Sequence, residues 1–218
     1  RIDDLVRLYW VVDAFSTQLG FSPMTSIASL LTQVRACEIC ADYLPLRPRP
    51  VLQVHPSARI LIVGQAPGRK VHDSGVPFND ASGARLREWL GMSREVFYDE
   101  QQAAILPMGF CFPGSNKSGD LPPRRECAPA WRAQLLSHLP NIALTLVIGQ
   151  YAQAYHLPQD AGNLTEAVRA WRRYWPDCVP LPHPSPRNNI WLKRHPWFAQ
   201  ELLPALRTRV AEIITPPN

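Results

Sequence analysis

Four of the five cysteines stand in two pairs, and this pairing is the first pattern in the chain that points to chemistry. Cys37 and Cys40 are separated by two residues, and Cys111 and Cys127 by fifteen. A Cys-x2-Cys turn brings two thiolates to one metal ion, and a second pair completes a tetrahedral set of sulphur ligands. The spacing fits structural zinc as well as an iron–sulphur cluster, because both accept four thiolates. The alternative is four ordinary buried cysteines, and the fifth, Cys178, is expected in the core.

Two loops of unusual composition follow short apolar runs. The first, residues 64–68, reads Gly-Gln-Ala-Pro-Gly, and the second begins at His183-Pro184-Ser185. If the runs before them are parallel strands, both loops lie beyond the carboxyl ends of the sheet, where open α/β folds bind ligands. Glycine in the first loop allows close approach of backbone N–H groups to a ligand, and His183 offers an imidazole N–H donor.

Strands and helices are expected to alternate along the chain. The apolar runs predict a sheet, and the amphipathic segments between them predict helices on both of its faces, so the expected fold is α/β with a central parallel four-stranded sheet. Expected strands are 59–63, 103–108, 144–149 and 178–181. Expected helices are 2–19, 26–36, 82–90 closed by Gly91, one ending near Leu139, 151–156, 165–175, and 197–214 interrupted by Pro204. A long basic loop is expected over 112–125.

Length and charge set broader limits. The chain has 218 residues, which suits one domain over residues 1–218 with a helical extension at about 1–36. The net charge is +5 and only three of 23 basic residues are Lys, which is compatible with a polyanionic partner but also with GC-rich coding. No stretch approaches the roughly 18 apolar residues of a membrane span. We therefore expect a cytoplasmic monomer with no membrane partner, whose cysteines are reduced, metal-bound or inert.

The order and spacing of these features resemble a known family. The residues that carry the resemblance are Cys37-x2-Cys40, Gly64-Gln65-Ala66-Pro67-Gly68, Gly75-Val76-Pro77-Phe78-Asn79, Ser82-Gly83, Cys111-x15-Cys127 and His183-Pro184-Ser185. Over roughly residues 35 to 205 the chain resembles the uracil-DNA glycosylase superfamily, and is most similar to its iron–sulphur branch, family 4. The resemblance implies a three-layer α/β/α sandwich, and a [4Fe-4S] cluster on the four paired cysteines, with zinc as the less favoured occupant. It implies DNA containing a damaged base as the partner.

The activity implied by the resemblance is hydrolysis of the N-glycosidic bond of uracil or another deaminated base in DNA. Such enzymes flip the nucleotide out of the base stack, because the reacting carbon cannot be reached inside a duplex. His183 then donates to a carbonyl oxygen of the leaving base, where negative charge develops. Phe78 stacks on the flipped base. The other His-Pro-Ser, at His55, precedes the first strand and is interpreted as structural.

The resemblance also implies contacts for the loops. Gly64, Ala66, Pro67 and Gly68 approach the base and phosphate, and Ser185 and Arg187 contact the flanking phosphates. Arg124 and Arg125 either join these phosphate contacts or form ordinary solvated surface.

Two positions depart from the family pattern. Gln65 stands where the iron–sulphur enzymes have a water-orienting Glu, and Ala66 stands where other branches use Asp or Asn. Gln holds a water but carries no negative charge. Pro107 stands where the family has the Asn that reads the base edge, and it has no side-chain donor or acceptor.

Nearby polar residues offer replacements. Asp80 or Asp73 is our hypothesis for the missing acid, and for Asp80 the alternative is an N-cap of the following helix. Asn116, Asn188 or Asn189 is the hypothesis for the missing amide.

The leading functional hypothesis is therefore a DNA glycosylase acting at His183 and Phe78, with Gln65 and Asp80 at the water. The alternative is a catalytically weak module that binds damaged or single-stranded DNA, which Gln65 and Pro107 favour. A zinc-stabilised α/β protein with an unrelated substrate is a third.

Overall fold

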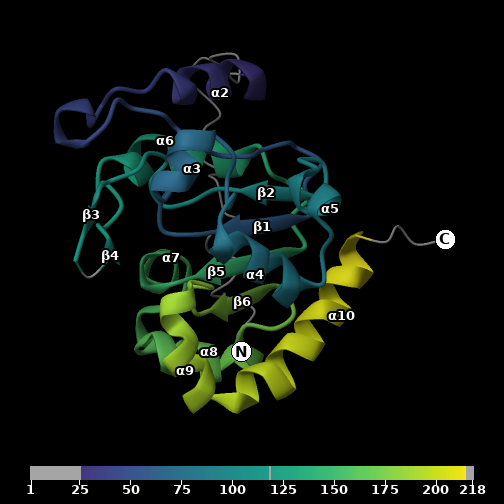
Figure 1. Cartoon of the computed structure of the whole chain (residues 1–218). Coiled ribbons are helices and arrows are strands. Elements are labelled where there is room, and N and C mark those ends of the chain that lie inside the picture. The colour runs from purple at the N-terminus through teal and green to yellow at the C-terminus, as the bar shows by residue number, and fades with distance from the viewer. Residues whose placement is uncertain (1–25, 118, 215–218) are drawn as a thin grey trace.

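A four-stranded parallel sheet forms the centre of the computed structural model, which describes residues 26–117 and 119–214 (Figure 1). Its strand order is β2-β1-β5-β6. The strands are β1 (Ile60–Val63), β2 (Ala103–Ile105), β5 (Leu144–Ile148) and β6 (Cys178–Leu181). All four expected strands are confirmed, although β2 ends three residues before Met108. The helix expected over residues 2–19 lies outside the described residues.

The strands form because each is a short apolar run buried on both faces, as parallel sheets require. Every residue of β1 is buried, and Ile62 lies opposite Ile105 of one neighbouring strand and Leu146 of the other. Side chains alternate between the two faces, so odd and even positions of β1 enter different cores. Ile60 and Ile62 belong to one core cluster, and Leu61 and Val63 to the second.

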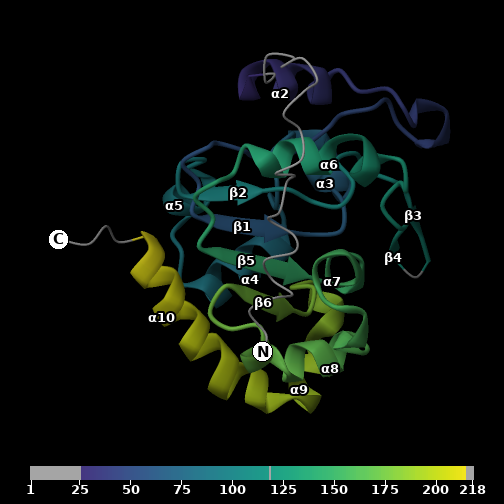
Figure 2. The ribbon, with the colours of Figure 1, turned by 180° about the vertical axis from the view of Figure 1, so that it is seen from behind.

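Helices cover both faces of the sheet, so the expected three-layer α/β/α arrangement is confirmed (Figures 1 and 2). On one face pack α4 (Ala81–Leu90) and α10 (Leu203–Ile214), through Leu86, Trp89, Leu90, Leu206, Val210 and Ile213. On the other pack α2 (Ile27–Arg35), α6 (Cys127–Ser137) and α7 (Gln150–His156), through Leu30, Val34, Leu135 and Ala152.

Several segments differ from the sequence expectation. The loop expected over 112–125 contains a hairpin of β3 (Ser115–Asn116) and β4 (Gly119–Asp120), and short helices form at α3 (Arg69–Ser74), α5 (Arg94–Tyr98) and α9 (Asn189–Arg194). The helix expected over 165–175 is divided into α8 (Leu164–Arg169) and a 3-10 turn, Trp171–Arg173. Further 3-10 turns are Ala41–Tyr43, Gln159–Ala161 and Pro186–Asn188. These elements are too short to show a periodic apolar stripe.

The last helix is irregular next to Pro204, as expected. A π-helical turn, Phe198–Leu202, leads directly into α10, and the backbone at Leu203 is helical, so the helix runs on through Pro204. The π turn lies where Pro204, which has no N–H, interrupts the regular hydrogen-bond pattern of the helix. In the part of the chain that the structure describes, no helix is long and apolar enough to cross a membrane.

The ends of the strands set the position of the functional loops. Loop 64–68 leaves the carboxyl end of β1, and the His183 loop leaves the carboxyl end of β6. The β3–β4 hairpin and α9 flank the same end of the sheet in Figure 1. The segments richest in candidate residues therefore meet at one edge.

Candidate active site and cysteine pocket

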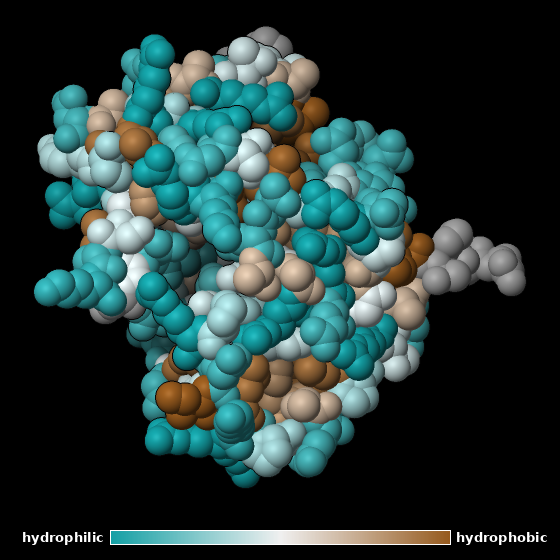
Figure 3. All heavy atoms as spheres, in the orientation of Figure 1, coloured by the Kyte–Doolittle hydropathy of each residue, from teal (hydrophilic) through white to brown (hydrophobic). Residues whose placement is uncertain are grey.

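A pocket of about 480 Å³ lies at this edge of the sheet, within the size range of small-molecule sites. Its walls come from loop 64–68, segment 77–82, the hairpin and the loop after β6. The lining residues are Val51, Gly64, Gln65, Ala66, Pro67, Gly68, Val71, Pro77, Phe78, Asp80, Ser82, Ile105, Pro107, Gly119, Asp120, His183, Ser185, Arg187 and Asn188. Figure 3 shows a hollow on this side of the molecule, with predominantly hydrophilic side chains around it.

His183 lies in the wall of this pocket and is half-buried. Its Nδ1 accepts the backbone N–H of Ser185 at 3.2 Å, which assigns the proton of the neutral ring to Nε2. The Asn188 side chain donates to the His183 carbonyl at 2.7 Å and holds the loop. Burial lowers the pKa of His183, and the nearby Asp80 and Asp120 partly oppose this effect. The imidazole is therefore a neutral N–H donor at pH 7.

The second His-Pro-Ser has the same local turn but a different location. The backbone N–H of Ser57 donates to His55 Nδ1 at 3.2 Å, matching the bond at His183. His55 precedes β1 and is not among the residues that line the pocket. Position after β6, rather than the tripeptide itself, distinguishes His183.

Phe78 is the aromatic side chain of the pocket wall and has an uncommon backbone conformation, with φ at 52°. A bulky residue with positive φ is strained, and such strain persists only where the surroundings enforce it. The Phe78 ring lies beside Gly64 and packs edge-on against the Phe97 ring, with the ring centroids 6.1 Å apart. A Cβ at Gly83 would collide with the Phe78 carbonyl, to which Tyr98 donates at 3.3 Å. These contacts fix the ring at the pocket.

Gln65 lines the pocket, but its amide is engaged. The side-chain Nε2 of Gln65 donates to the backbone carbonyl of Leu121 at 2.8 Å. The backbone carbonyl of Gln65 accepts the N–H of Gly109 at 3.0 Å. The side chain therefore joins the loop after β1 to the residue that follows β4.

The two carboxylates proposed from the sequence differ in location. Asp80 lines the pocket and is the N-cap of α4, where Oδ1 accepts the N–H of Gly83 at 2.9 Å, so the alternative interpretation as a cap is confirmed. Asp73 instead pairs with Arg69 at 2.9 Å, and both side chains are exposed. Asp73 is not among the pocket-lining residues.

Asp120 is a pocket carboxylate that sequence reasoning missed. It lies in β4 and accepts a hydrogen bond from the Ser115 hydroxyl at 2.9 Å. Its Oδ2 lies 3.3 Å from where a Cβ on Gly68 would stand. The available signal was that Asp120 is the single acidic residue of segment 112–125.

The three asparagines proposed to hydrogen-bond the base differ in their location. Asn188 lines the pocket, whereas Asn116 and Asn189 are not among its lining residues. Asn116 lies in β3, where its Oδ1 accepts the N–H of Gly119 at 3.2 Å. The expected contact of Asn116 with the base therefore has no support in this geometry.

The residues expected to bind phosphate lie at the rim. Ser185 Oγ accepts the N–H of Arg187 at 3.3 Å, and the Ser185 carbonyl accepts from Arg85 at 3.1 Å. The exposed Arg187 guanidinium lies against Gly119 of the hairpin. The loop after β6 thus meets the hairpin across the pocket mouth.

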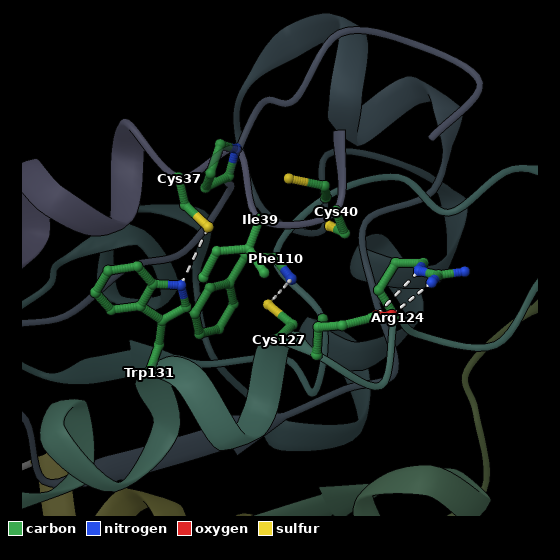
Figure 4. A pocket seen from close by; sticks show the side chains of 11 residues that line it. Cys37, Ile39, Cys40, Phe110, Arg124, Cys127 and Trp131 are labelled. Carbon is green, nitrogen blue, oxygen red and sulfur yellow. Dashed lines mark hydrogen bonds and ion pairs between the residues drawn. The ribbon is translucent and has the colours of Figure 1, made fainter. Parts of the chain in front are cut away.

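All four paired cysteines line a second pocket (Figure 4). The Trp131 indole donates to Cys37 Sγ at 3.2 Å, and the Phe110 backbone N–H donates to Cys127 Sγ at 3.4 Å. All five cysteines are free thiols. N–H donors aimed at sulphur are the surroundings that tune a thiolate-ligated metal centre.

Burial governs the acidity of the Cys127 and Cys111 thiols. It raises the pKa of Cys127 to about 12 and that of Cys111 to about 11, with smaller contributions from the neighbouring cysteines. Over residues 26–117 and 119–214, no group of three or more His, Cys, Asp or Glu side chains is arranged to hold a metal ion. The structure thus shows a shared pocket of four thiols rather than an assembled ligand set. Cys178 lies outside it and packs against the core, as expected.

A buried arginine connects the helix that begins at Cys127 to the wall of the first pocket. Arg132 of α6 is fully buried and donates to the carbonyls of Leu106 and Pro107 at 3.0 and 3.1 Å. Its Nη2 lies 2.7 Å from His156 Nε2. Burial lowers the pKa of Arg132 to about 10, and it lowers the pKa of His156 to about 3 with the help of Arg132. The neutral His156 ring is therefore the acceptor of this bond.

A family model described as the uracil DNA glycosylase superfamily matches residues 52–207, which is more than half of the chain. The chain belongs to the uracil DNA glycosylase superfamily. Two similar proteins, each named Type-4 uracil-DNA glycosylase, come from Sulfurisphaera tokodaii and Saccharolobus solfataricus. The first is 27% identical over 150 residues, 67% of this chain and 64% of the relative. The second is 26% identical over 136 residues, 61% of this chain and 59% of the relative.

The chain thus spans less than two thirds of the length of either Type-4 uracil-DNA glycosylase. The resemblance inferred from the sequence motifs is confirmed at the level of the superfamily and of similarity to family 4. This uracil DNA glycosylase superfamily member has Gln65 and Pro107 in the wall of its pocket, where the family pattern predicts Glu and Asn.

Proposed function

We propose that the protein is a DNA glycosylase that hydrolyses the N-glycosidic bond of uracil or a related deaminated base, flipped out of DNA. The observation that carries the proposal is the meeting of His183 and Phe78 in one pocket at the carboxyl ends of the strands, in a member of this superfamily. A flipped base requires a pocket of this kind, because its reacting bond is shielded inside the duplex.

His183 stabilises the leaving base. As the C1′–N bond breaks, its electron pair moves into the base and negative charge collects on a carbonyl oxygen. The Nε2–H of the neutral imidazole donates to that oxygen, and the Ser185 N–H on Nδ1 keeps the proton on Nε2. Because burial lowers the His183 pKa, the ring keeps this form at pH 7.

Phe78 holds the base in the pocket. Its backbone is held by the close approach of Gly83 and the Tyr98 hydrogen bond, and its ring packs edge-on against Phe97, so little conformational entropy is lost when a base stacks on it. Gly64, Ala66, Pro67 and Gly68 form the wall that approaches base and sugar closely, since they carry small or fixed side chains. Ser185 and Arg187 bind the flanking phosphates at the rim.

The wall around Pro107 is apolar, and this affects which base is selected. Val51, Ile105 and Pro107 line this part of the pocket. Pro107 has no side-chain donor, and its carbonyl accepts from Arg132. The site therefore lacks an amide at the position expected to read uracil. The side-chain amides that do line the pocket, Gln65 and Asn188, each donate to a backbone carbonyl. We infer weaker discrimination among deaminated bases than a hydrogen-bonding wall would give.

A [4Fe-4S] cluster on Cys37, Cys40, Cys111 and Cys127 is part of the proposal. The donor set fits: four thiols line one pocket, and N–H groups of Trp131 and Phe110 point at two of the sulphurs. When bound, the cluster would join the turn after α2 to the start of α6. Zinc, which accepts the same ligands, is the less favoured occupant.

Oligonucleotides containing uracil, hypoxanthine or xanthine, single-stranded and duplex, test the activity. Each is incubated with the protein, and alkali then cleaves any abasic site. Strand cleavage at a deaminated base supports the glycosylase proposal. Absence of cleavage on every substrate, with the cluster intact, would overturn it.

A catalytically weak module that binds damaged or single-stranded DNA is the second candidate. Two observations favour it. The Gln65 amide donates to the Leu121 carbonyl, and the Pro107 side chain in the pocket wall has no donor or acceptor for hydrogen bonds to a base. This candidate predicts tighter binding to lesion-bearing than to undamaged oligonucleotides, measured by fluorescence anisotropy, without abasic product.

A further inference from the structure

Hydrolysis of a glycosidic bond needs a group that takes a proton from water and offsets the positive charge of the sugar. A carboxylate does both, and paired carboxylates serve this chemistry in glycoside hydrolysis. Among the described residues that line the pocket, the carboxylates are Asp80 and Asp120. Both lie near enough to His183 to raise its pKa against the effect of burial.

Asp80 is committed to the backbone. Its Oδ1 accepts the N–H of Gly83 as the N-cap of α4. A capping carboxylate that gains a proton loses part of this bond, so taking a proton from water would destabilise the start of the helix that supports Phe78. Asp80 is therefore suited to a fixed negative charge and poorly suited to proton transfer.

Asp120 is oriented differently. The Ser115 hydroxyl donates to Oδ1 from the opposite strand of the hairpin, at 2.9 Å. This bond leaves Oδ2 facing Gly68, whose missing side chain makes the space for it. The carboxylate is thereby held against the loop that follows β1, inside the pocket wall.

Gln65 fixes the hairpin in this position. Its Nε2 donates to the carbonyl of Leu121, the residue directly after Asp120. The Leu121 N–H donates in turn to the Gly114 carbonyl at 2.9 Å and closes the hairpin. The amide of Gln65 thus acts as an anchor for the strand that carries the carboxylate, which a carboxylate at position 65 would not do, because it lacks a donor.

We propose that Asp120 is the catalytic carboxylate of this pocket, with Ser115 and Gln65 as its positioning residues. This inference rests on the proposed glycosidic hydrolysis. The C1′–N bond breaks and its electron pair leaves with the base. A water oxygen bonds to C1′, and Asp120 Oδ2 takes one proton from that water. This proton later passes to the released base, so that one water is consumed for each abasic site and free base formed.

Single-turnover cleavage of a deaminated substrate tests the catalytic role. Asp120→Asn keeps the acceptor for Ser115 and is expected to lower the rate constant about 100-fold at pH 7, the lower range of general-base contributions. Asp120→Glu restores part of the rate. Asp160→Asn, which removes an exposed carboxylate paired with Arg173, is the matched control and keeps the wild-type rate.

A binding measurement separates this inference from the proposed function. One oligonucleotide carries a pyrrolidine nucleotide, whose ring nitrogen is cationic, and the other carries the neutral tetrahydrofuran analogue. The wild-type protein is expected to prefer the cationic analogue by about tenfold, as a close pair of opposite charges provides, and Asp120→Asn is expected to lose that preference.

The outcomes are distinct. Cleavage by the wild type with an unchanged rate in Asp120→Asn would overturn the inference and leave the glycosylase proposal standing. A slower Asp120→Asn variant that keeps the cationic preference would also overturn it, since the residue would then act only on the hairpin. No cleavage, with a preference that Asp120→Asn abolishes, would refute the glycosylase proposal and support the placement of Asp120 at the sugar. No cleavage and no preference would overturn both.

Discussion

Gln65 Nε2 donates to the carbonyl oxygen of Leu121 across 2.8 Å, joining the loop after β1 to the β3–β4 hairpin. These residues are 56 positions apart in the chain. The bond places the hairpin, and with it Asp120, over the pocket. A residue that looks like a lost catalytic acid in the sequence is therefore a structural donor in the fold.

Gln65→Ala tests this anchor. Removing the donor leaves the Leu121 carbonyl without this partner, and a hydrogen bond of this kind contributes about 1 kcal/mol. We expect amide hydrogen exchange in the hairpin to become about fivefold faster, while exchange in β1 and β5 stays unchanged. Gln65→Glu is expected to behave in the same way, because an ionised carboxylate cannot donate. Unchanged exchange in both variants would show that the hairpin is held by other contacts.

Phe78→Leu tests the stacking surface of the pocket. Leu keeps an apolar side chain but loses the aromatic face, which is worth about 1 to 3 kcal/mol for each stacked base. We expect the variant to bind an oligonucleotide with an extrahelical base at least about fivefold more weakly. Affinity for undamaged DNA should stay unchanged, because the phosphate contacts remain. Equal weakening for both DNAs would argue against a contact with the flipped base.

Cys127→Ser tests the metal proposal, with Cys178→Ser as its matched control. Cys127 lines the shared pocket, whereas Cys178 packs in the core outside it. We expect Cys127→Ser to lose bound iron and its visible absorption, and Cys178→Ser to keep both. Zinc in place of iron in the wild-type protein, determined by elemental analysis, would refute the cluster. Equal iron content in the two variants would refute Cys127 as a ligand.

His156→Gln tests the buried contact with Arg132. Burial lowers the native pKa of His156 to about 3, against an ordinary value of 6.5. Below pH 6.5 the unfolded chain binds a proton that the folded chain does not, so stability falls as the pH is lowered from 6.5 towards 3. The loss from this group is roughly 2 kcal/mol at pH 5.

Urea unfolding at pH 7 and pH 5 measures this effect. His156→Gln keeps a side-chain acceptor for Arg132 but does not titrate, so its loss of stability between the two pH values should be smaller than that of the wild type. An equal loss in both proteins would mean that His156 is protonated in the folded state.

The sheet and its helices were predictable from the sequence because their signals are local. The run Ile60–Val63 is short and apolar, and Gly64 follows it. The apolar stripe of α4 ends at Gly91, whose φ is 65°. The hairpin was not predictable in this way. Ser115–Asn116 and Gly119–Asp120 contain no apolar alternation, and their placement depends on long-range contacts such as the Gln65 bond.

The same distinction applies to the site. His183 was found because it follows a predicted strand, and Phe78 because it stands in a motif that resembles the family pattern; both line the pocket. Asp120 was missed because its strand had not been predicted. Asn116 was proposed from its place in the chain, but its side chain accepts from Gly119 within the hairpin. Proximity along the chain does not specify which face of a two-residue strand meets a pocket.

The two His-Pro-Ser turns allow the most direct test of the central claim, which is base excision at His183. Free base released from a uracil-containing oligonucleotide is measured under single-turnover conditions for the wild type, His183→Ala and His55→Ala. In both histidines Nδ1 accepts a serine backbone N–H at 3.2 Å. Of the two, His183 is the one that lines the pocket. We predict that His183→Ala lowers the rate constant at least about 100-fold, as loss of an oxyanion donor does, and that His55→Ala stays within about twofold. Equal rates for the two variants would contradict the account.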